Sequence, residues 1–235
     1  MRTVLIPGLV CRSSLLLFAA DTNAQAEVRG AIQQLASQPN YSWTATPKAE
    51  GNAPLIRQGP TIGEVEQNGF TYFRFTLEGN PVQVALKAEK SAIKTEAAWE
   101  SAKELPEDRR WIVRRLEGFK APAAEAEDLL RICRTVRSEK GGSFAGDLTP
   151  NGVKALLLSR SRDDFSARVS PGAKGSVKFW IKNGMLAKYE YSLQGKITLT
   201  DHQQEFAINR TITVEITKIG STKIQIPEEA KKKLG

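Results

Sequence analysis

The side chains that could do chemistry in this sequence are few. The single histidine, His202, follows Asp201 in the segment TDHQQEF, between two expected strands. A histidine beside an aspartate is part of a hydrolytic triad, so a hydrolase with an unrecognised site is one hypothesis. We favour a water-exposed turn residue, because the sequence has no G-x-S-x-G motif that would supply a nucleophile. A single histidine also leaves too few ligands for most zinc or iron sites.

Cys133 is the other reactive side chain. The apolar residues around it recur at helical spacing, which predicts a helix over residues 122–137 with Cys133 on its buried face. Nothing nearby in the sequence would lower the pKa of its thiol, so we expect an inert cysteine. Because the sequence also lacks a glycine-rich phosphate loop and an EF-hand pattern, we expect no catalytic residue, no metal and no cofactor. The protein is therefore predicted not to be an enzyme.

A basic segment, PEDRRWIVRRLEGFK, is a candidate for contact with a partner. A helix over residues 107–119 would carry four arginines beside four apolar residues. The arginines are Arg109, Arg110, Arg114 and Arg115, and the apolar residues are Trp111, Ile112, Leu116 and Phe119. Such a helix can lie on an anionic membrane surface. The alternative, which we favour, is that the apolar residues pack on a sheet while the arginines face water, because the segment is short.

The overall composition is that of a globular protein with a real core. The chain has 235 residues, of which 40% are hydrophobic and 26% charged. Its 34 Lys and Arg residues outnumber 26 Asp and Glu, and the formal net charge of +8 favours anionic partners such as lipid headgroups. No recognition helix or RNA-binding motif accompanies this charge, so we expect no nucleic-acid partner.

The first 26 residues are typical of a cleaved export signal. Arg2 precedes a mostly apolar stretch, and Ala24-Gln25-Ala26 has the small-x-small pattern of a cleavage site. We therefore expect export to the periplasm or cell envelope, and a mature chain whose only cysteine is Cys133. A lipid-modified Cys11 is a weaker hypothesis, because Val10 stands where a small residue would be needed. A structural helix is weaker too, because the polar segment DTNAQA would interrupt it.

The elements that must position these side chains are clearest in residues 175–227, which we expect to form four antiparallel strands. Apolar residues alternate along each strand, and Asn183-Gly184 between two such runs predicts a type I′ hairpin turn. The residues expected on apolar faces of this sheet are Val177, Phe179, Ile181, Tyr189, Tyr191, Ile212, Val214 and Ile216. The last of the four strands is expected to carry Thr222, Ile224 and Ile226.

The rest of the chain predicts a mixture of strands and helices. A helix over residues 27–37 ends before Pro39, and Tyr41, Trp43 and Ala45 alternate as in a strand. A meander follows over residues 61–67, 70–77 and 82–88, and then helices over 97–105, 107–119 and 122–137. A strand over residues 143–148 precedes a helix through residue 158, which Thr149-Pro150 begins.

The order of these elements and two motifs resemble the lipoprotein-carrier (LolA-like) superfamily. The motifs are KFWIKNGMLAKYEYSLQGK, similar to a hairpin of that family, and TVEITKIGSTKIQIPEEAKKKL, similar to its terminal strands. The resemblance implies one α+β domain over residues 27–235, a strongly curved, unclosed antiparallel half-barrel with several helices on its concave face. It also implies a space between sheet and helices that accepts a hydrophobic ligand. Trp99, Trp111 and Phe119, on the expected helices, are our candidates for the lid or mouth of that space, and ordinary core packing is the alternative.

Three functions remain open from the sequence. The first is an exported, non-catalytic binding protein, expected to be a monomer, that carries or senses a lipid, a lipoprotein or another hydrophobic envelope component. The second is a structural or interaction module of the cell envelope without a small-molecule ligand. The third is the hydrolase considered above, for which a cleft with convergent titratable groups would be needed.

Overall fold

The computed structural model describes residues 15–50, 59–67, 69–77, 79–95, 98–116, 118–158, 167–199 and 204–235. Only the backbone is described for residues 15–22, 77, 108, 111, 114 and 115. The residues of two hypotheses, Cys11 and the pair Asp201-His202, lie outside these ranges.

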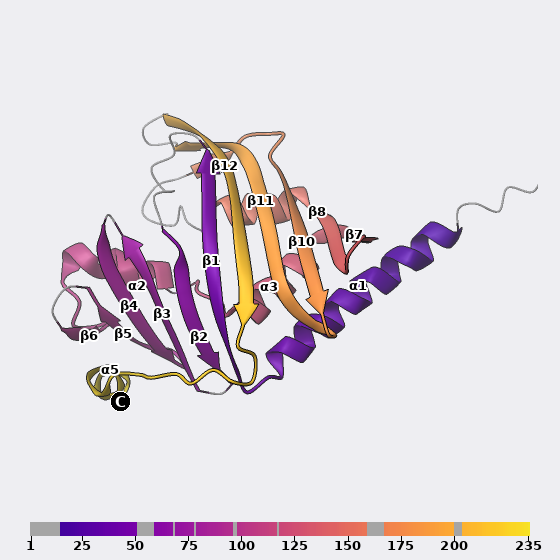
Figure 1. The fold of residues 1–235 in the computed structure, drawn as a ribbon. Coiled ribbons are helices and arrows are strands. Elements are labelled where there is room, and N and C mark those ends of the chain that lie inside the picture. The colour runs from indigo at the N-terminus through magenta and orange to yellow at the C-terminus, as the bar shows by residue number, and fades with distance from the viewer. Residues whose placement is uncertain are drawn as a thin grey trace, which may run out of the picture.

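In the described part of the chain, twelve strands form one antiparallel sheet that does not close into a barrel (Figure 1). The order along the sheet is β6-β5-β4-β3-β2-β1-β12-β11-β10-β8-β7, and β9 pairs with β11. The strands are β1 (Asn40–Glu50), β2 (Thr61–Glu66), β3 (Phe70–Leu77), β4 (Asn80–Lys87), β5 (Lys90–Lys94), β6 (Trp99–Ser101), β7 (Cys133–Glu139), β8 (Ser143–Leu148), β9 (Ala167–Val169), β10 (Lys174–Lys182), β11 (Met185–Leu199) and β12 (Gln204–Thr217). This is the half-barrel architecture that the resemblance to the LolA-like superfamily implies.

The hairpin β10–β11 forms as its turn residues predict. Asn183 and Gly184 both have positive φ, 52° and 73°, as a type I′ turn requires. Seven of the eight residues expected on apolar faces of this part of the sheet are buried, and Ile181 is half-buried against the core. The two-faced alternation of residues 175–217 therefore identifies the core face correctly.

The predicted fourth strand over Thr222–Ile226 is wrong. β12 pairs with β11 on one side and with β1 on the other, where Trp43 lies opposite Ile216. A strand has only two edges, so no ladder position beside β12 remains for residues 222–226. These residues instead run across the outer face of the sheet toward α5 (Glu228–Leu234).

Helices cover the concave face, which lies behind the sheet in Figure 1. They are α1 (Leu15–Ala36), α2 (Arg110–Leu116), α3 (Pro122–Arg131) and α4 (Pro150–Leu158), with a 3₁₀ turn, η2 (Glu107–Arg109), before α2. The predicted helix through residue 158 is confirmed, and the Thr149 side-chain oxygen accepts a 3.2 Å hydrogen bond from the backbone N–H of Gly152. This bond satisfies one of the free N–H groups at the start of α4.

The helix predictions in the middle of the chain need correction. Residues 97–105 form no helix in their described part, because Trp99 pairs with Lys94 across the β5–β6 hairpin. The helix expected over 122–137 ends at Arg131, and Cys133 begins strand β7, which pairs with β8. In both places a helical periodicity is overridden by strand pairing with a neighbour.

The first helix is longer than expected. α1 is continuous through the expected cleavage site, Ala24-Gln25-Ala26. The polar segment DTNAQA therefore does not interrupt the helix. Its buried stripe recurs at helical spacing and comprises Ala24, Val28, Ala31, Ile32 and Leu35. Cleavage after Ala26 stays a prediction. None of the described helices is long and apolar enough to cross a membrane.

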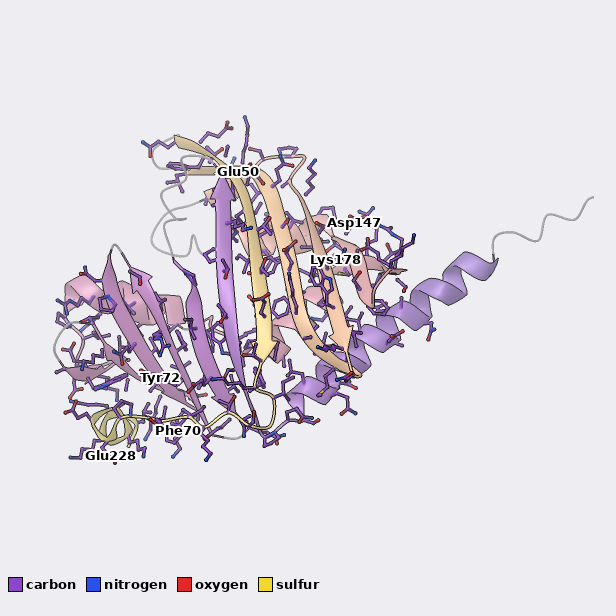
Figure 2. The ribbon with its side chains drawn as sticks, viewed as in Figure 1. Glu50, Phe70, Tyr72, Asp147, Lys178 and Glu228 are labelled. Atoms are coloured by element: carbon purple, nitrogen blue, oxygen red, sulfur yellow. The ribbon has the colours of Figure 1, made fainter. Side chains whose placement is uncertain are left out.

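The sheet carries two hydrophobic clusters on opposite faces. Val84 and Ile93 belong to the large core under α1–α4, whereas their neighbours Ala85 and Ala92 belong to a smaller cluster with Trp99. Because successive residues of a strand point to opposite faces, the second cluster lies on the outer face. α5 covers it with Ala230 and Leu234. Phe70 and Tyr72 of β3 border the same cluster, near α5 in Figure 2.

Candidate ligand-binding site

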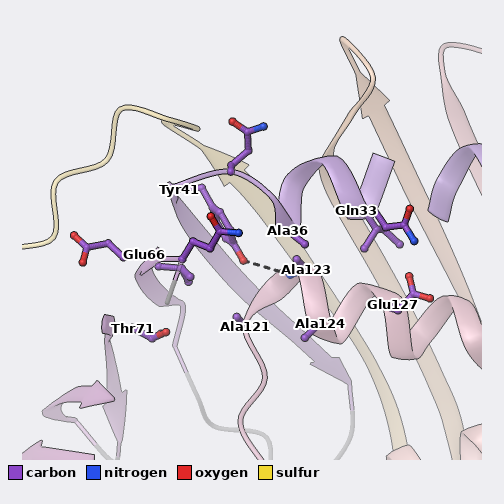
Figure 3. Close-up of a pocket in the computed structure, with 13 residues that line it drawn as sticks. Gln33, Ala36, Tyr41, Glu66, Thr71, Ala121, Ala123, Ala124 and Glu127 are labelled. Carbon is purple, nitrogen blue, oxygen red and sulfur yellow. Dashed lines mark hydrogen bonds between the residues drawn. The ribbon is translucent and has the colours of Figure 1, made fainter. Parts of the chain in front are cut away.

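A groove of about 610 Å³ opens where the helices meet the sheet. One wall is formed by the end of α1 and the start of α3, and the other by the start of β1, the end of β2 and the start of β3 (Figure 3). Its lining residues are Ile32, Gln33, Ala36, Gln38, Tyr41, Val65, Glu66, Gln67, Thr71, Ala121, Ala123, Ala124 and Glu127. The volume falls within the range of small-molecule sites.

The lining divides into an apolar part and a polar part. The apolar part consists of aliphatic side chains and the ring of Tyr41. The polar part has three glutamines, Thr71 and two carboxylates, from Glu66 and Glu127. Among the lining residues there is no lysine or arginine. One oxygen of Glu127 bonds Arg29 at 3.4 Å, and the other is buried without a hydrogen-bond partner among the described residues. The groove can hold an apolar chain and offers hydrogen-bond acceptors at its side.

Tyr41 connects the groove to the start of α3. Alternation in β1 places it on the concave face, where it is buried. Its hydroxyl oxygen accepts a 3.4 Å hydrogen bond from the backbone N–H of Ala123. The helix begins with Ala121 and Pro122 and has no side-chain cap of its own, so Tyr41 supplies an acceptor from the sheet. Burial raises the pKa of Tyr41 to about 12, and the phenol stays neutral.

A second polar link joins α3 to the sheet behind the groove. The carboxylate of Glu125 accepts hydrogen bonds from the hydroxyls of Tyr189, at 2.5 Å, and Tyr191, at 3.2 Å. Tyr189 is fully buried, and burial, followed by the nearby charge of Glu125, raises its pKa well above the ordinary value. These bonds attach α3, and with it the helical wall of the groove, to β11.

An aromatic cluster lies on the concave face next to the groove. Phe119, just after α2, stacks on Phe73 of β3 with ring centroids 4.6 Å apart, and Trp43 of β1 lies 6.2 Å from both rings. The indole of Trp43 occupies the space beside Gly63, where a Cβ atom would lie 2.3 Å from the ring. Glycine at position 63 is therefore required by this close approach.

No protein-family model matches the sequence, and no curated protein matches it. Solved structures that are similar to the chain include two mycobacterial proteins. The lipoprotein LppX of Mycobacterium tuberculosis is 11% identical, with a TM-score of 0.48, over 88% of this chain and 100% of LppX. LprF of Mycobacterium bovis is 10% identical, with a TM-score of 0.50, over 89% of this chain and 98% of LprF. At such identities the likeness to LprF is one of fold. The chain has a LolA-like fold.

The LolA-like fold does not bring the three predicted site residues together. Phe119 lies half-buried in the concave core, next to the groove. Trp99 is a strand residue, not a helix residue, and its indole is buried on the outer face under α5. Trp111 is in α2, where only its backbone is described. A ligand-binding role for these three residues stays a prediction.

The basic segment of this LolA-like chain is partly engaged in local contacts. Arg109 donates a 2.6 Å hydrogen bond to the side-chain oxygen of Thr95, and Arg110 forms a 2.8 Å ion pair with Glu107. Ile112 is buried in the core, as expected if the apolar residues pack on the sheet. The side chains of Arg114 and Arg115 are not described, and contact with an anionic membrane stays a prediction.

Cys133 lies half-buried at the start of β7, not on a helix. Burial, followed by the charge of Asp147, raises the pKa of its thiol to about 12, so the thiol is unreactive at neutral pH, as the sequence predicts. Among the described residues, no group of three or more His, Cys, Asp or Glu side chains could hold a metal ion.

The resemblance implies a space between sheet and helices, but the residues that line this groove were not predicted from the sequence. Its residues come from five separate segments, and most of them are alanine, glutamine or glutamate, which carry no motif. One local signal was available: α3 begins with Ala-Pro and lacks a Ser, Thr, Asp or Asn cap. An uncapped helix start predicts that another part of the chain supplies the acceptor, and here that part is Tyr41.

Proposed function

We propose that this chain is a non-catalytic binding protein that carries a lipid or another hydrophobic ligand of the cell envelope in this groove. The observation that carries the proposal is the groove between α1, α3 and strands β1–β3, with its aliphatic lining. An apolar pocket with a few convergent polar groups is the usual form of a small-molecule site. The LolA-like half-barrel supports it, because a curved sheet and its helical cover leave space between them.

The polar part of the groove orients the ligand in this proposal. An acyl chain lies against Ile32, Val65 and Ala123, and the polar end of the ligand lies near Gln33, Glu66 and Glu127. A buried carboxylate oxygen without a partner, such as that of Glu127, gains a hydrogen bond from a donor on the ligand.

The chemistry of the lining supports binding and not catalysis. Thr71 and Tyr41 carry its only hydroxyls, and no histidine or cysteine is among the lining residues. The phenol of Tyr41 has a raised pKa and is a poor nucleophile or base at neutral pH. The lining thus offers no nucleophile activated by an adjacent base.

The proposal is tested by titration with a phosphatidylcholine that carries a pyrene-labelled acyl chain, together with mass spectrometry of lipids that copurify under native conditions. Ala36 and Ala124 are exposed residues on the helical wall, so Ala36→Trp and Ala124→Trp fill the groove without entering the core. Ala155→Trp, at an exposed position of α4 away from the groove, is the matched control.

We expect the wild type and Ala155→Trp to bind the probe equally, and the two groove variants to lose at least ~10-fold in affinity, since the added indole occupies the ligand's volume. Equal binding by all four proteins would place the ligand elsewhere. A wild type that binds no probe and releases no copurified lipid would favour an envelope interaction module instead.

A further inference from the structure

The sheet can be divided into two halves that meet at the β1–β2 ladder. β1 pairs with β2 only from Asn40 to Ala45, whereas residues 46–50 of β1 pair with β12. We call β2–β6 the first half-sheet, and β1 with β7–β12 the second half-sheet. Among the described elements, α1 packs on β7, β10 and β11, and α4 on β9, β10 and β11. These two helices therefore belong to the second half-sheet.

The groove lies at the junction of the two halves. Its helical wall, α1 and α3, is fixed to the second half-sheet, in part by the bonds of Glu125 to Tyr189 and Tyr191. Its other wall includes Val65 and Glu66 of β2, Thr71 of β3, and Gln67 in the turn between these two strands of the first half-sheet. A rotation of one half against the other would therefore change the width of the groove.

A segment on the outer face connects both halves. Residues 218–227, which we call the strap, leave β12 and cross the sheet to α5 (Figure 1). At one end the strap is bonded to β1. Gly220 N–H donates to the backbone oxygen of Asn40 at 2.8 Å, Thr222 N–H donates to its side-chain oxygen at 2.8 Å, and the hydroxyls of Thr222 and Ser42 lie 2.9 Å apart.

The other end of the strap is held by α5 on the first half-sheet. Ile226, Ala230 and Leu234 are buried against Ala85, Ala92 and Trp99. Two polar contacts add to this packing: Lys233 pairs with Glu104 at 2.7 Å, and Lys90 donates to the backbone oxygen of Gly235 at 2.9 Å. α5 has only seven residues, and a helix of that length is not stable in water by itself. Its helical state therefore depends on docking.

We propose that docking of α5 controls the exchange of ligand in the groove. With α5 docked, the strap holds the first half-sheet in place and the groove keeps its width. When α5 is released, the link on the outer face is lost, while the β1–β2 ladder and the shared concave core still join the halves, and the groove opens more readily for ligand entry and exit. The inference rests on the proposed function and adds its regulation. Coupling between two sites is reciprocal, so a ligand that widens the groove also weakens the docking of α5.

Trp99 provides a direct readout of α5, because its indole is buried under this helix. Acrylamide quenching of the wild type, compared with that of Trp99→Phe, isolates the fluorescence of this residue. Leu234→Ala removes a buried contact of α5, and Lys232→Ala changes an exposed side chain of the same helix as the control. Ligand exchange is followed as transfer of the pyrene-labelled phosphatidylcholine to excess unlabelled vesicles.

We expect Leu234→Ala to increase both the quenching of Trp99 and the rate of probe transfer, the latter about tenfold, a typical magnitude for coupling between two sites. Lys232→Ala should match the wild type in both. Increased quenching with an unchanged transfer rate would overturn the inference while the proposed function stands. A wild type that binds no probe would instead contradict the proposed function.

A crosslink tests the same inference if Leu234→Ala does not fold. Ala92 and Ala230 are buried in one cluster on two elements in contact, so the double variant Ala92→Cys/Ala230→Cys is designed to join α5 to β5. We expect oxidation to slow probe transfer below the wild-type rate and reductant to restore it, with Ala92→Cys alone unaffected. An oxidised, crosslinked protein that exchanges the probe at the wild-type rate would show that α5 need not be released.

Discussion

The hydroxyl of Tyr189 on β11 donates a 2.5 Å hydrogen bond to the carboxylate of Glu125 in α3. This bond crosses from the sheet to the helix that forms one wall of the groove. Tyr189 is fully buried, so its hydroxyl has no access to water if the carboxylate is removed. The pair therefore couples the position of α3 to the stability of the core.

Removal of Glu125 tests this coupling. We expect Glu125→Ala to lower the free energy of unfolding by about 1–3 kcal/mol, because it leaves the buried hydroxyl of Tyr189 without an acceptor. Glu125→Gln keeps an acceptor oxygen and should cost less. The measurement is urea denaturation followed by circular dichroism. Equal losses for the two variants would mean that packing, and not the hydrogen bond, sets the effect.

The raised pKa of Tyr41 predicts that the free energy of unfolding decreases at alkaline pH. Its pKa is raised from 10.0 to about 12 in the folded chain, so the unfolded chain releases this proton first as the pH rises. The contribution of this pKa difference to the free energy of unfolding is fully present below pH 10 and is lost as the pH rises toward 12. The full loss is about 2–3 kcal/mol.

The measurement is the urea midpoint of the wild type and of Tyr41→Phe between about pH 9 and about pH 12, a range that includes the shift of the pKa from 10.0 to about 12. The variant should be less stable at pH 9, because the N–H of Ala123 loses its acceptor, but its stability should fall less steeply above pH 10. Parallel curves for the two proteins would contradict the assignment.

The close contact between Gly63 and the indole of Trp43 predicts that a larger side chain at position 63 destabilises the fold. A Cβ atom at this position would lie 2.3 Å from the indole of Trp43, so Gly63→Ala should destabilise the fold by about 1–3 kcal/mol. Gly30→Ala is the control, because nothing lies within 4 Å of its Cβ position and alanine favours the helix. Thermal unfolding compares the two. Pairing Gly63→Ala with Trp43→Phe should recover part of the loss, and full additivity of the two changes would argue against a clash.

Cys133 predicts slow thiol chemistry. Because burial raises the pKa of its thiol to about 12, a thiol reagent such as DTNB at pH 8 should label it far more slowly in the folded chain than in urea. The experiment is done in a Cys11→Ser background, so that Cys133 is the only cysteine. Labelling at the same rate in the folded and unfolded chains would show that the thiol is accessible.

Local chemistry explains what could be predicted from the sequence. The turn at Asn183-Gly184 requires positive φ at both residues, which few other residue pairs adopt easily. The alternation along β10, β11 and β12 then identifies the buried face one residue at a time. The cap at Thr149 likewise depends only on its neighbour Gly152, so the start of α4 was predictable.

Distant contacts explain what could not be predicted. Trp99 has helical spacing relative to its neighbours, but it is buried by Ala230 and Leu234, more than a hundred residues later in the chain. Cys133 continues the apolar stripe of α3, yet pairing with β8 decides its conformation. The groove depends on the same kind of information, because its walls are side chains that no local pattern brings together.

The pairing of β1 with β12 also bears on when the protein can fold. Trp43 lies opposite Ile216, so the sheet has a gap between β1 and β11 until β12 has been synthesised. A chain whose early strand must wait for a late one has a high contact order and folds slowly. The ladder between β1 and β12 therefore forms only after Thr217 has been made, late in translation.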